Sequence, residues 1–226
     1  MNRKIKLLIL ILLSLSVYFI YEKNHNAKYS ITSIGDKLSL GINSYGSKDY
    51  SYINYYQDYL KKTKEHVSIN NAYSEENQTI KEVLLLLKET PELKRVLYDT
   101  NCLIITLGYN DLLERQSLEE DKTQIDQVIE DILVDYKELI KEIRKYYKED
   151  IIVIGYYTSP LEDYYLIEGI KRLNKGLKEE NVIYIDTDSI LKNKQKYFSN
   201  PKSYYPNYLG YERISSQIIR KTLEKT

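Results

Sequence analysis

From Tyr29 onward the sequence alternates short apolar runs with amphipathic segments, and this alternation constrains the fold more than any other feature. Continuous apolar runs are typical of strands buried on both faces, because an exposed face would require polar residues at alternate positions. We expect five such strands, at residues 29–34, 67–72, 101–107, 151–156 and 182–186. The segments between them show helical spacing, at 50–62, 79–88, 123–147, 162–179 and 209–223.

Strands that alternate with helices form parallel sheets whose two faces are both covered. The sequence therefore predicts one α/β domain over residues 29–226, a three-layer α/β/α sandwich with a parallel five-stranded sheet. Hydrophobic residues make up 42% of the chain, which is ordinary for a globular protein with a core of this kind. The helix at 79–88 is expected to stop near Pro91, because proline cannot continue a helix.

The N-terminus has a different character. Residues 7–21 carry no charge and follow a basic stretch. This run is short for a transmembrane helix, which needs about 17–25 residues, but the aliphatic stems of Lys6 and Lys23 extend it. No small-residue cleavage site follows Tyr21. We therefore expect an uncleaved signal anchor at residues 1–22 and a linker at 23–28, with a cleaved signal peptide and a secreted protein as the alternative.

The basic residues before the apolar run also predict its orientation, because positive charges stay on the cytoplasmic side of a membrane. The expected location is the cell membrane, in single-pass form, with the domain outside the cytoplasm.

In open parallel sheets, ligands bind beyond the carboxyl ends of the strands. The polar residues that follow the expected strands are Asp36, Lys37, Ser74, Glu75, Asn110, Asp111, Tyr157, Ser159, Asp186 and Asp188, and the loop 200–208 belongs to the same rim. His25 lies in the linker, whereas His66 and Cys102 lie at the starts of strands. We therefore expect no Ser–His or Cys–His pair, of the kind that activates a nucleophile, at this rim.

Three segments at this rim resemble the motifs of the SGNH (GDSL-type) hydrolases. Residues 35–41 read Gly-Asp-Lys-Leu-Ser-Leu-Gly, similar to the Gly-Asp-Ser-Leu-Ser block that ends the first strand of that family. Residues 108–111 read Gly-Tyr-Asn-Asp and are similar to its Gly-x-Asn-Asp block. Residues 205–211 resemble the last block, in which Asp-x-x-His-Pro-Asn precedes Gly-Tyr. The resemblance covers residues 29–226 and implies an SGNH-hydrolase fold.

The resemblance also implies that the usual ester hydrolase site is substituted. Lys37 stands where the family has its nucleophilic Ser, Tyr205 where it has its His, and Lys202 where it has the Asp that orients the His. Glu75 aligns with the oxyanion Gly of the second block, and only Asn110 retains its family identity. A protonated lysine, a tyrosine with a pKa near 10 and a carboxylate all oppose ordinary acyl transfer.

These substitutions predict a membrane-anchored protein outside the cytoplasm that lacks hydrolase activity and acts in cell-envelope binding or scaffolding. Lys37 and Glu75 are expected to form an ion pair in the former oxyanion site, and Asp36, Asn110 and Asp111 are the candidate ligand-binding residues. The expected partner, besides the membrane, is a cell-envelope glycan or a membrane or envelope protein. Paired tyrosines at 156–157, 164–165 and 204–205 are candidates for a sugar-binding rim.

The alternative is an active esterase or acyl hydrolase, of the lipase or carbohydrate-deacetylase type, with a rearranged site. Ser39 is then the candidate nucleophile, or Ser203 with Lys37 as its base. Ser39 lies two residues into the turn, a position that favours capping of the helix start or packing against it.

Other function classes lack support in the sequence. Lys plus Arg and Asp plus Glu both number 33, and this balance argues against nucleic acid as a partner. The chain has neither a glycine-rich dinucleotide fingerprint nor a P-loop, so no cofactor is expected. Asp186 and Asp188 suit either a bound cation or a helix cap, and the cap is favoured, so no metal is expected.

Overall fold

The structure is a computed structural model that describes residues 28–118, 125–158, 164–191, 195–200 and 204–225, together with Ile9 and residues 12–16. Most of the expected membrane anchor and linker lie outside the described residues, as do Lys202 and Ser203. Within the ranges described, no helix has both the length and the apolar character needed to cross a membrane.

A five-stranded parallel sheet forms the centre of the fold, as the apolar runs predict. Its strands are β1 (Tyr29–Gly35), β2 (Val67–Ser74), β3 (Cys102–Thr106), β4 (Ile151–Ile154) and β5 (Ile183–Ile185). The order across the sheet is β2-β1-β3-β4-β5, and all neighbouring pairs are parallel. Every residue of β3 and β4 is buried, as expected for strands covered on both faces.

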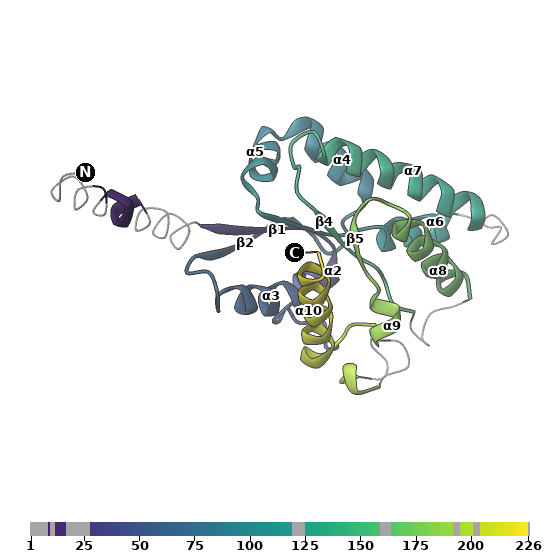
Figure 1. The fold of residues 1–226 in the computed structure, drawn as a ribbon. Helices are drawn as coiled ribbons and strands as arrows, with labels where there is room; N and C mark the ends of the chain where they lie inside the picture. Colours follow the sequence, from purple (N-terminus) through teal and green to yellow (C-terminus); the bar gives the residue numbers. More distant parts are fainter. Residues whose placement is uncertain are drawn as a thin grey trace.

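Two layers of helices cover the sheet (Figure 1). One layer contains α2 (Lys37–Leu40), α3 (Tyr52–Leu60), α9 (Thr187–Leu191) and α10 (Tyr208–Leu223). The other contains α4 (Ile80–Glu89), α5 (Pro91–Asp99), α6 (Tyr109–Leu118), α7 (Ile125–Ile143) and α8 (Tyr164–Lys178). A 3₁₀ turn, η2 (Gln195–Tyr197), precedes the segment that leads into α10. The predicted three-layer α/β/α arrangement is confirmed.

The structure corrects the expectation for the region around Pro91. Proline ends α4 as predicted, but it also begins a further helix, α5, which the sequence analysis did not include. Pro91 occupies the first turn of α5, where its missing N–H is not needed and its fixed φ suits a helix. Leu93 and Leu97 of α5 are fully buried, so packing against the sheet stabilises this short helix.

A further helix that was not among those expected, α6, starts within the Gly-Tyr-Asn-Asp segment at Tyr109. Gly108 has a φ of +118°, a value that glycine adopts without strain, and it allows the chain to turn directly from β3 into the helix. The turn brings Tyr109 and Asn110 to the edge of the sheet at the first turn of α6.

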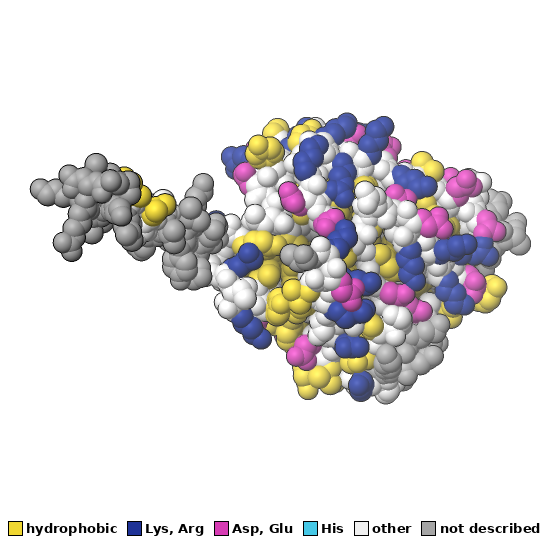
Figure 2. Space-filling view, in the orientation of Figure 1, with side chains coloured by type: hydrophobic (Ala, Val, Ile, Leu, Met, Phe, Trp, Pro, Cys, Tyr) yellow, Lys and Arg dark blue, Asp and Glu magenta, His cyan; other side chains and the backbone are white. Residues whose placement is uncertain are grey.

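On the face shown in Figure 2, basic and acidic side chains are interspersed over the surface. This mixture matches the equal numbers of Lys plus Arg and Asp plus Glu in the sequence.

One buried polar group in the core leads to a stability prediction. Tyr136 of α7 is fully buried, and its hydroxyl has no hydrogen-bond partner among the described residues. An unsatisfied buried hydroxyl costs about 1–3 kcal/mol, so Tyr136→Phe is expected to raise the melting temperature by a few degrees. Tyr211→Phe is the matched control, because the Tyr211 hydroxyl donates to the Ile42 carbonyl at 2.6 Å and its loss is expected to destabilise. Calorimetry on both variants tests this, and a lower melting temperature for Tyr136→Phe contradicts it.

Candidate functional site

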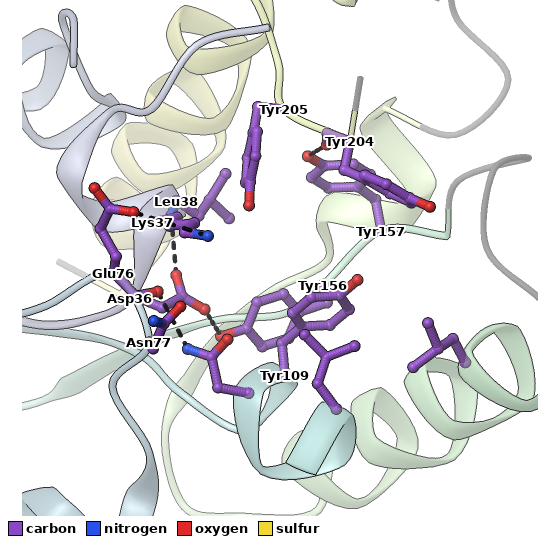
Figure 3. Close-up of a pocket in the computed structure, with 13 residues that line it drawn as sticks. Asp36, Lys37, Leu38, Glu76, Asn77, Tyr109, Tyr156, Tyr157, Tyr204 and Tyr205 are labelled. Atoms are coloured by element: carbon purple, nitrogen blue, oxygen red, sulfur yellow. Dashed lines mark hydrogen bonds and ion pairs between the residues drawn. The ribbon is translucent and has the colours of Figure 1, made fainter. Parts of the chain in front are cut away.

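A cleft of about 300 Å³ opens at the carboxyl ends of β1 to β4 (Figure 3). The order of the strands reverses between β1 and β3, and parallel sheets bind ligands beside such a reversal. Thirteen residues line it: Asp36, Lys37, Leu38, Glu76, Asn77, Tyr109, Asn110, Leu113, Tyr156, Tyr157, Leu166, Tyr204 and Tyr205. Five of the thirteen are tyrosines, which makes tyrosine the most frequent residue type in the lining.

The floor of the cleft is built around Asp36, directly after β1. Its side chain accepts a hydrogen bond from the Leu38 N–H at 2.9 Å and so caps the short helix α2. Its backbone N–H donates to the Thr106 carbonyl at the end of β3, at 3.2 Å. These bonds fix the turn and place Lys37, the first residue of α2, at the edge of the cleft.

The Asp36 carboxyl is buried and has a second partner. The Tyr156 hydroxyl donates to its Oδ2 at 2.5 Å, from the segment after β4. Burial raises the pKa of Asp36 to about 6, although the hydrogen bonds from Tyr156 and Leu38 oppose this shift. The sequence analysis assigned Asp36 to ligand binding, and the structure places it in the lining of the cleft with its carboxylate bonded within the protein.

Lys37 extends from α2 into the cleft, in the view of Figure 3. The carboxylate within ion-pair distance is that of Glu76, with 3.8 Å between Lys37 Nζ and Glu76 Oε2. The expected partner was Glu75, the preceding residue. Glu75 is exposed, and its backbone N–H is bonded to the Gly35 carbonyl at the end of β1, so the next residue along the chain reaches the cleft instead.

Asn110 and Asp111 have structural partners in the turn after β2. The Asn110 amide donates to the carbonyl of Gln78 at 3.0 Å and to that of Glu76 at 3.4 Å. Asn110 therefore lines the cleft and also braces the loop that carries Glu76 and Asn77. Asp111 is outside the lining. Its carboxylate accepts from the Ile80 N–H at 3.1 Å and so binds the start of α4.

Asp111 is buried, and burial raises the pKa of its carboxyl to about 7, against the opposing effect of the Ile80 N–H. Glu114 and Asp135 lie close enough to raise this pKa further by repulsion between like charges. Asp111 is therefore bonded to the start of α4 beneath the cleft and does not face a ligand.

Ser39, the alternative nucleophile, is 1% exposed and does not line the cleft. Its hydroxyl donates to the Asp36 carbonyl at 2.7 Å. A hydroxyl that is buried and bonded to a backbone carbonyl lacks both the base and the access that nucleophilic catalysis needs. The Ser39 side chain is thus packed at the start of α2, one of its two expected roles, whereas the N-cap of this helix is Asp36.

The wall opposite Asp36 is formed by the segment before α10. Tyr205 points into the cleft in Figure 3, and its backbone carbonyl accepts from the Ser44 hydroxyl at 2.6 Å. The Tyr157 hydroxyl donates to the Tyr204 carbonyl, which ties this segment to the end of β4. Burial raises the pKa of Tyr205 to about 12, so its hydroxyl keeps its proton at neutral pH and is a poor base.

Of the three tyrosine pairs singled out in the sequence, two lie at the cleft. The pairs 156–157 and 204–205 both line it, whereas Tyr164 is exposed and Tyr165 is buried in the core between the sheet and α8. Tyr109 supplies the fifth ring, and its centroid lies 5.4 Å from that of Tyr156.

The sequence analysis missed Glu76, Asn77 and three leucines, Leu38, Leu113 and Leu166. Glu76 and Asn77 directly follow Glu75, the residue that was expected at this part of the rim. Leu113 lies one helical turn after Tyr109, and a helical reading of the third block would have put both on one face.

The remaining candidates lie elsewhere. His66 is exposed before β2, and Cys102 is buried at the start of β3, so both are at the opposite end of the sheet from the cleft. Asp186 accepts from the Ser189 N–H at 3.1 Å and pairs with Lys178 at 2.7 Å. Asp188 accepts from the Thr158 N–H at 2.7 Å. The aspartates therefore have capping and bridging partners, as the sequence favoured.

Comparisons with known proteins agree with this architecture. The chain is similar to a lipase, Lip_vut3 from a goat rumen metagenome, with a TM-score of 0.73 and 20% identity over 86% of this chain and 97% of the other. It is also similar to Axe2, an acetylxylan esterase from Geobacillus stearothermophilus. A catalytic mutant of Axe2 gives a TM-score of 0.65 and 16% identity over 88% of this chain and 95% of the other. At these identities the likeness concerns the fold alone.

A search of the curated proteins finds no match. The model of the GDSL-like Lipase/Acylhydrolase family matches residues 30–213, a span that includes the turn after β1, the start of α6 and the segment before α10. The chain therefore belongs to the GDSL-like lipase/acylhydrolase family.

Proposed function

We propose that this protein is a member of the family without hydrolase activity, which binds a ligand in the tyrosine-lined cleft. One observation carries the proposal. In the described part of the chain, no Ser, Cys, Thr or His lines the cleft, and Lys37 occupies the position that follows Gly-Asp at the end of β1. Acyl transfer through an enzyme nucleophile requires a nucleophile with a base beside it, and the described lining offers no hydroxyl or thiol nucleophile.

The electrostatics of the cleft support the same reading. Asp36 is bonded to Tyr156 and Leu38, and Asn110 is bonded to the carbonyls of the loop after β2. The donors and acceptors that remain suit binding, because an enclosed aromatic wall with a few polar groups is typical of a ligand pocket.

The cellular setting is part of the proposal. The uncharged run at residues 7–21 supports a signal anchor that holds the domain at the outer side of the cell membrane. In that location the ligand is a cell-envelope glycan or a membrane or envelope protein.

An active esterase with a rearranged site is the second candidate, because solved structures of similar fold are a lipase and an acetylxylan esterase. Ser203 would be its nucleophile and Lys37 its base. Because the Ser39 hydroxyl is buried and bonded to a backbone carbonyl, Ser203 is the better candidate nucleophile of the two serines named in the sequence.

Incubation of the full-length protein with a fluorophosphonate probe separates the two candidates. We expect no covalent labelling and no turnover of short-chain or acetylated-sugar esters above the buffer rate, in a preparation that melts cooperatively. Labelling that is lost in Ser203→Ala and kept in the matched surface variant Ser216→Ala would establish the esterase instead.

A further inference from the structure

The ammonium of Lys37 has unused bonding capacity inside the cleft. Among the described residues its one ion pair is with Glu76 at 3.8 Å, which is longer than a hydrogen bond of about 2.7–3.2 Å. A lysine ammonium carries three donors and no acceptor. The Lys37 side chain is 32% exposed and extends into the space between Tyr205 and the floor, so a ligand in the cleft meets these donors.

The carboxylates near Lys37 do not fill that space. The two oxygens of Asp36 are bonded to the Leu38 N–H and the Tyr156 hydroxyl beneath the cleft. The Glu76 side chain is 60% exposed, and in Figure 3 it lies at the rim, on the far side of Lys37 from the tyrosines. Lys37 is thus the charged group that projects toward the aromatic wall, which favours an anion beside it.

The tyrosines suit a ring-shaped, hydroxylated ligand. Their faces carry partial negative charge and attract the C–H groups of a saccharide ring. The Tyr205 hydroxyl keeps its proton at neutral pH, because burial raises its pKa to about 12, and so it remains a donor. A volume of about 300 Å³ accommodates one or two sugar units.

Resting on the binding function proposed above, we infer that the cleft binds an anionic saccharide, whose carboxylate or phosphate pairs with Lys37 while its ring packs on the tyrosine wall. Glu76 then competes with the ligand for Lys37 and sets the affinity for the anion.

Isothermal titration of the full-length protein, purified in a mild detergent, tests this inference. The ligands are glucuronate oligosaccharides, a sugar phosphate, a neutral oligosaccharide of equal length, and inorganic phosphate alone. We expect the acidic saccharides to bind about tenfold more tightly than the neutral one, because they gain a charge-assisted hydrogen bond to Lys37. The preference is expected to fall as salt is raised. Whether the glucuronate or the sugar phosphate binds more tightly identifies the anion.

Four variants separate the contributions of Lys37 and Glu76 to the binding of acidic saccharides. Lys37→Met is expected to abolish the preference for acidic saccharides, and Lys37→Arg to retain most of it. Glu76→Gln is expected to strengthen acidic binding a few-fold by removing the competing carboxylate. Lys81→Met is the matched control, because Lys81 is an exposed lysine paired with Asp135 at 3.7 Å away from the cleft.

Four results would overturn the inference. Equal binding of neutral and acidic saccharides would leave a binding cleft without anion selectivity. An unchanged preference in Lys37→Met would place the anion selectivity on a group other than Lys37. In both cases the proposed function would stand. Binding of inorganic phosphate as tight as that of the saccharides would reduce the site to an adventitious anion position. Absence of any saccharide binding would overturn the inference, and ester turnover in the same preparation would overturn the proposed function with it.

Discussion

At pH 8 the free energy of unfolding is expected to be about 4 kcal/mol lower than at pH 5, because burial raises the pKa values of Asp36 and Asp111 to about 6 and about 7. Both carboxyl groups have ordinary values near 4 in an unfolded chain. Between the pKa values of the unfolded and folded states, the folded state therefore binds more protons than the unfolded state. Stability from these groups is present at acidic pH and is lost as the pH rises from about 4 to about 7.

Asp111 accounts for the larger part of this difference in the free energy of unfolding. Its shift corresponds to about 3 kcal/mol between pH 5 and pH 8, and that of Asp36 to about 1 kcal/mol. Above pH 7 the Asp111 carboxylate stays buried at the start of α4, with the Ile80 N–H as its partner. The hydrogen bond offsets part of the cost of burying the charge, but the pKa of Asp111 stays above its ordinary value.

Denaturant unfolding at pH 5 and pH 8 measures this difference. Asp111→Asn keeps an oxygen that accepts from Ile80 but cannot titrate, so it is expected to lose most of the pH dependence. Asp99→Asn is the matched control, since Asp99 is an exposed residue at the end of α5. If Asp111→Asn retains the full pH dependence of the wild type, the assignment to Asp111 is wrong.

The strands and the overall architecture were predictable because burial on both faces leaves a strong signal in the sequence. β4 is apolar throughout, and β3 is apolar up to its last residue, Thr106. Short apolar runs of this kind between turn residues are typical of buried strands. α5 was missed because a proline signals both the end of one helix and the first turn of the next. Only the burial of Leu93 and Leu97 decides between these readings, and burial depends on the tertiary fold.

The positions of the three motifs after the expected strands were sufficient to predict that they lie at one edge of the sheet. Their contacts with one another could not be predicted in this way. The expected partner of Lys37 was off by one residue, because β2 ends in an irregular register with β1 and the position of Glu76 depends on it. Asp111 was assigned to the ligand because it belongs to the polar residues that follow the third strand, whereas successive residues of a helix point in different directions. Tertiary contacts therefore decide which polar residues face the cleft.

Within the site, we expect stability to be most sensitive to substitution of Gly41, in the turn that presents Lys37. This residue ends α2 with a φ of +75°, and its N–H bonds to the Leu38 carbonyl. A Cβ at Gly41 would lie 2.4 Å from the Asp49 carbonyl oxygen and 3.0 Å from the Ser51 backbone N. Both atoms belong to the segment that starts α3, so they cannot move aside as the end of a flexible side chain can.

Gly41→Ala is therefore expected to lower the free energy of unfolding by about 3 kcal/mol, of which about 1 kcal/mol is backbone strain and the rest is the clash. For a domain of this size the melting temperature is expected to fall by about 6–12 °C. Gly46 provides a matched control in the same loop. Its φ is +79°, but a Cβ there would meet nothing within 4 Å, so Gly46→Ala carries the strain without the clash.

Comparison of the two alanine variants by calorimetry isolates the contact between the 36–41 turn and the start of α3. Gly46→Ala is expected to lower the melting temperature by about 2–4 °C, which is the effect of strain alone. Equal losses in the two variants would mean that the turn relaxes freely, and Lys37 would then not be held rigidly at the cleft. A larger loss in Gly41→Ala means that the segment before α3 clamps the turn and thereby fixes the start of α2 at the edge of the cleft.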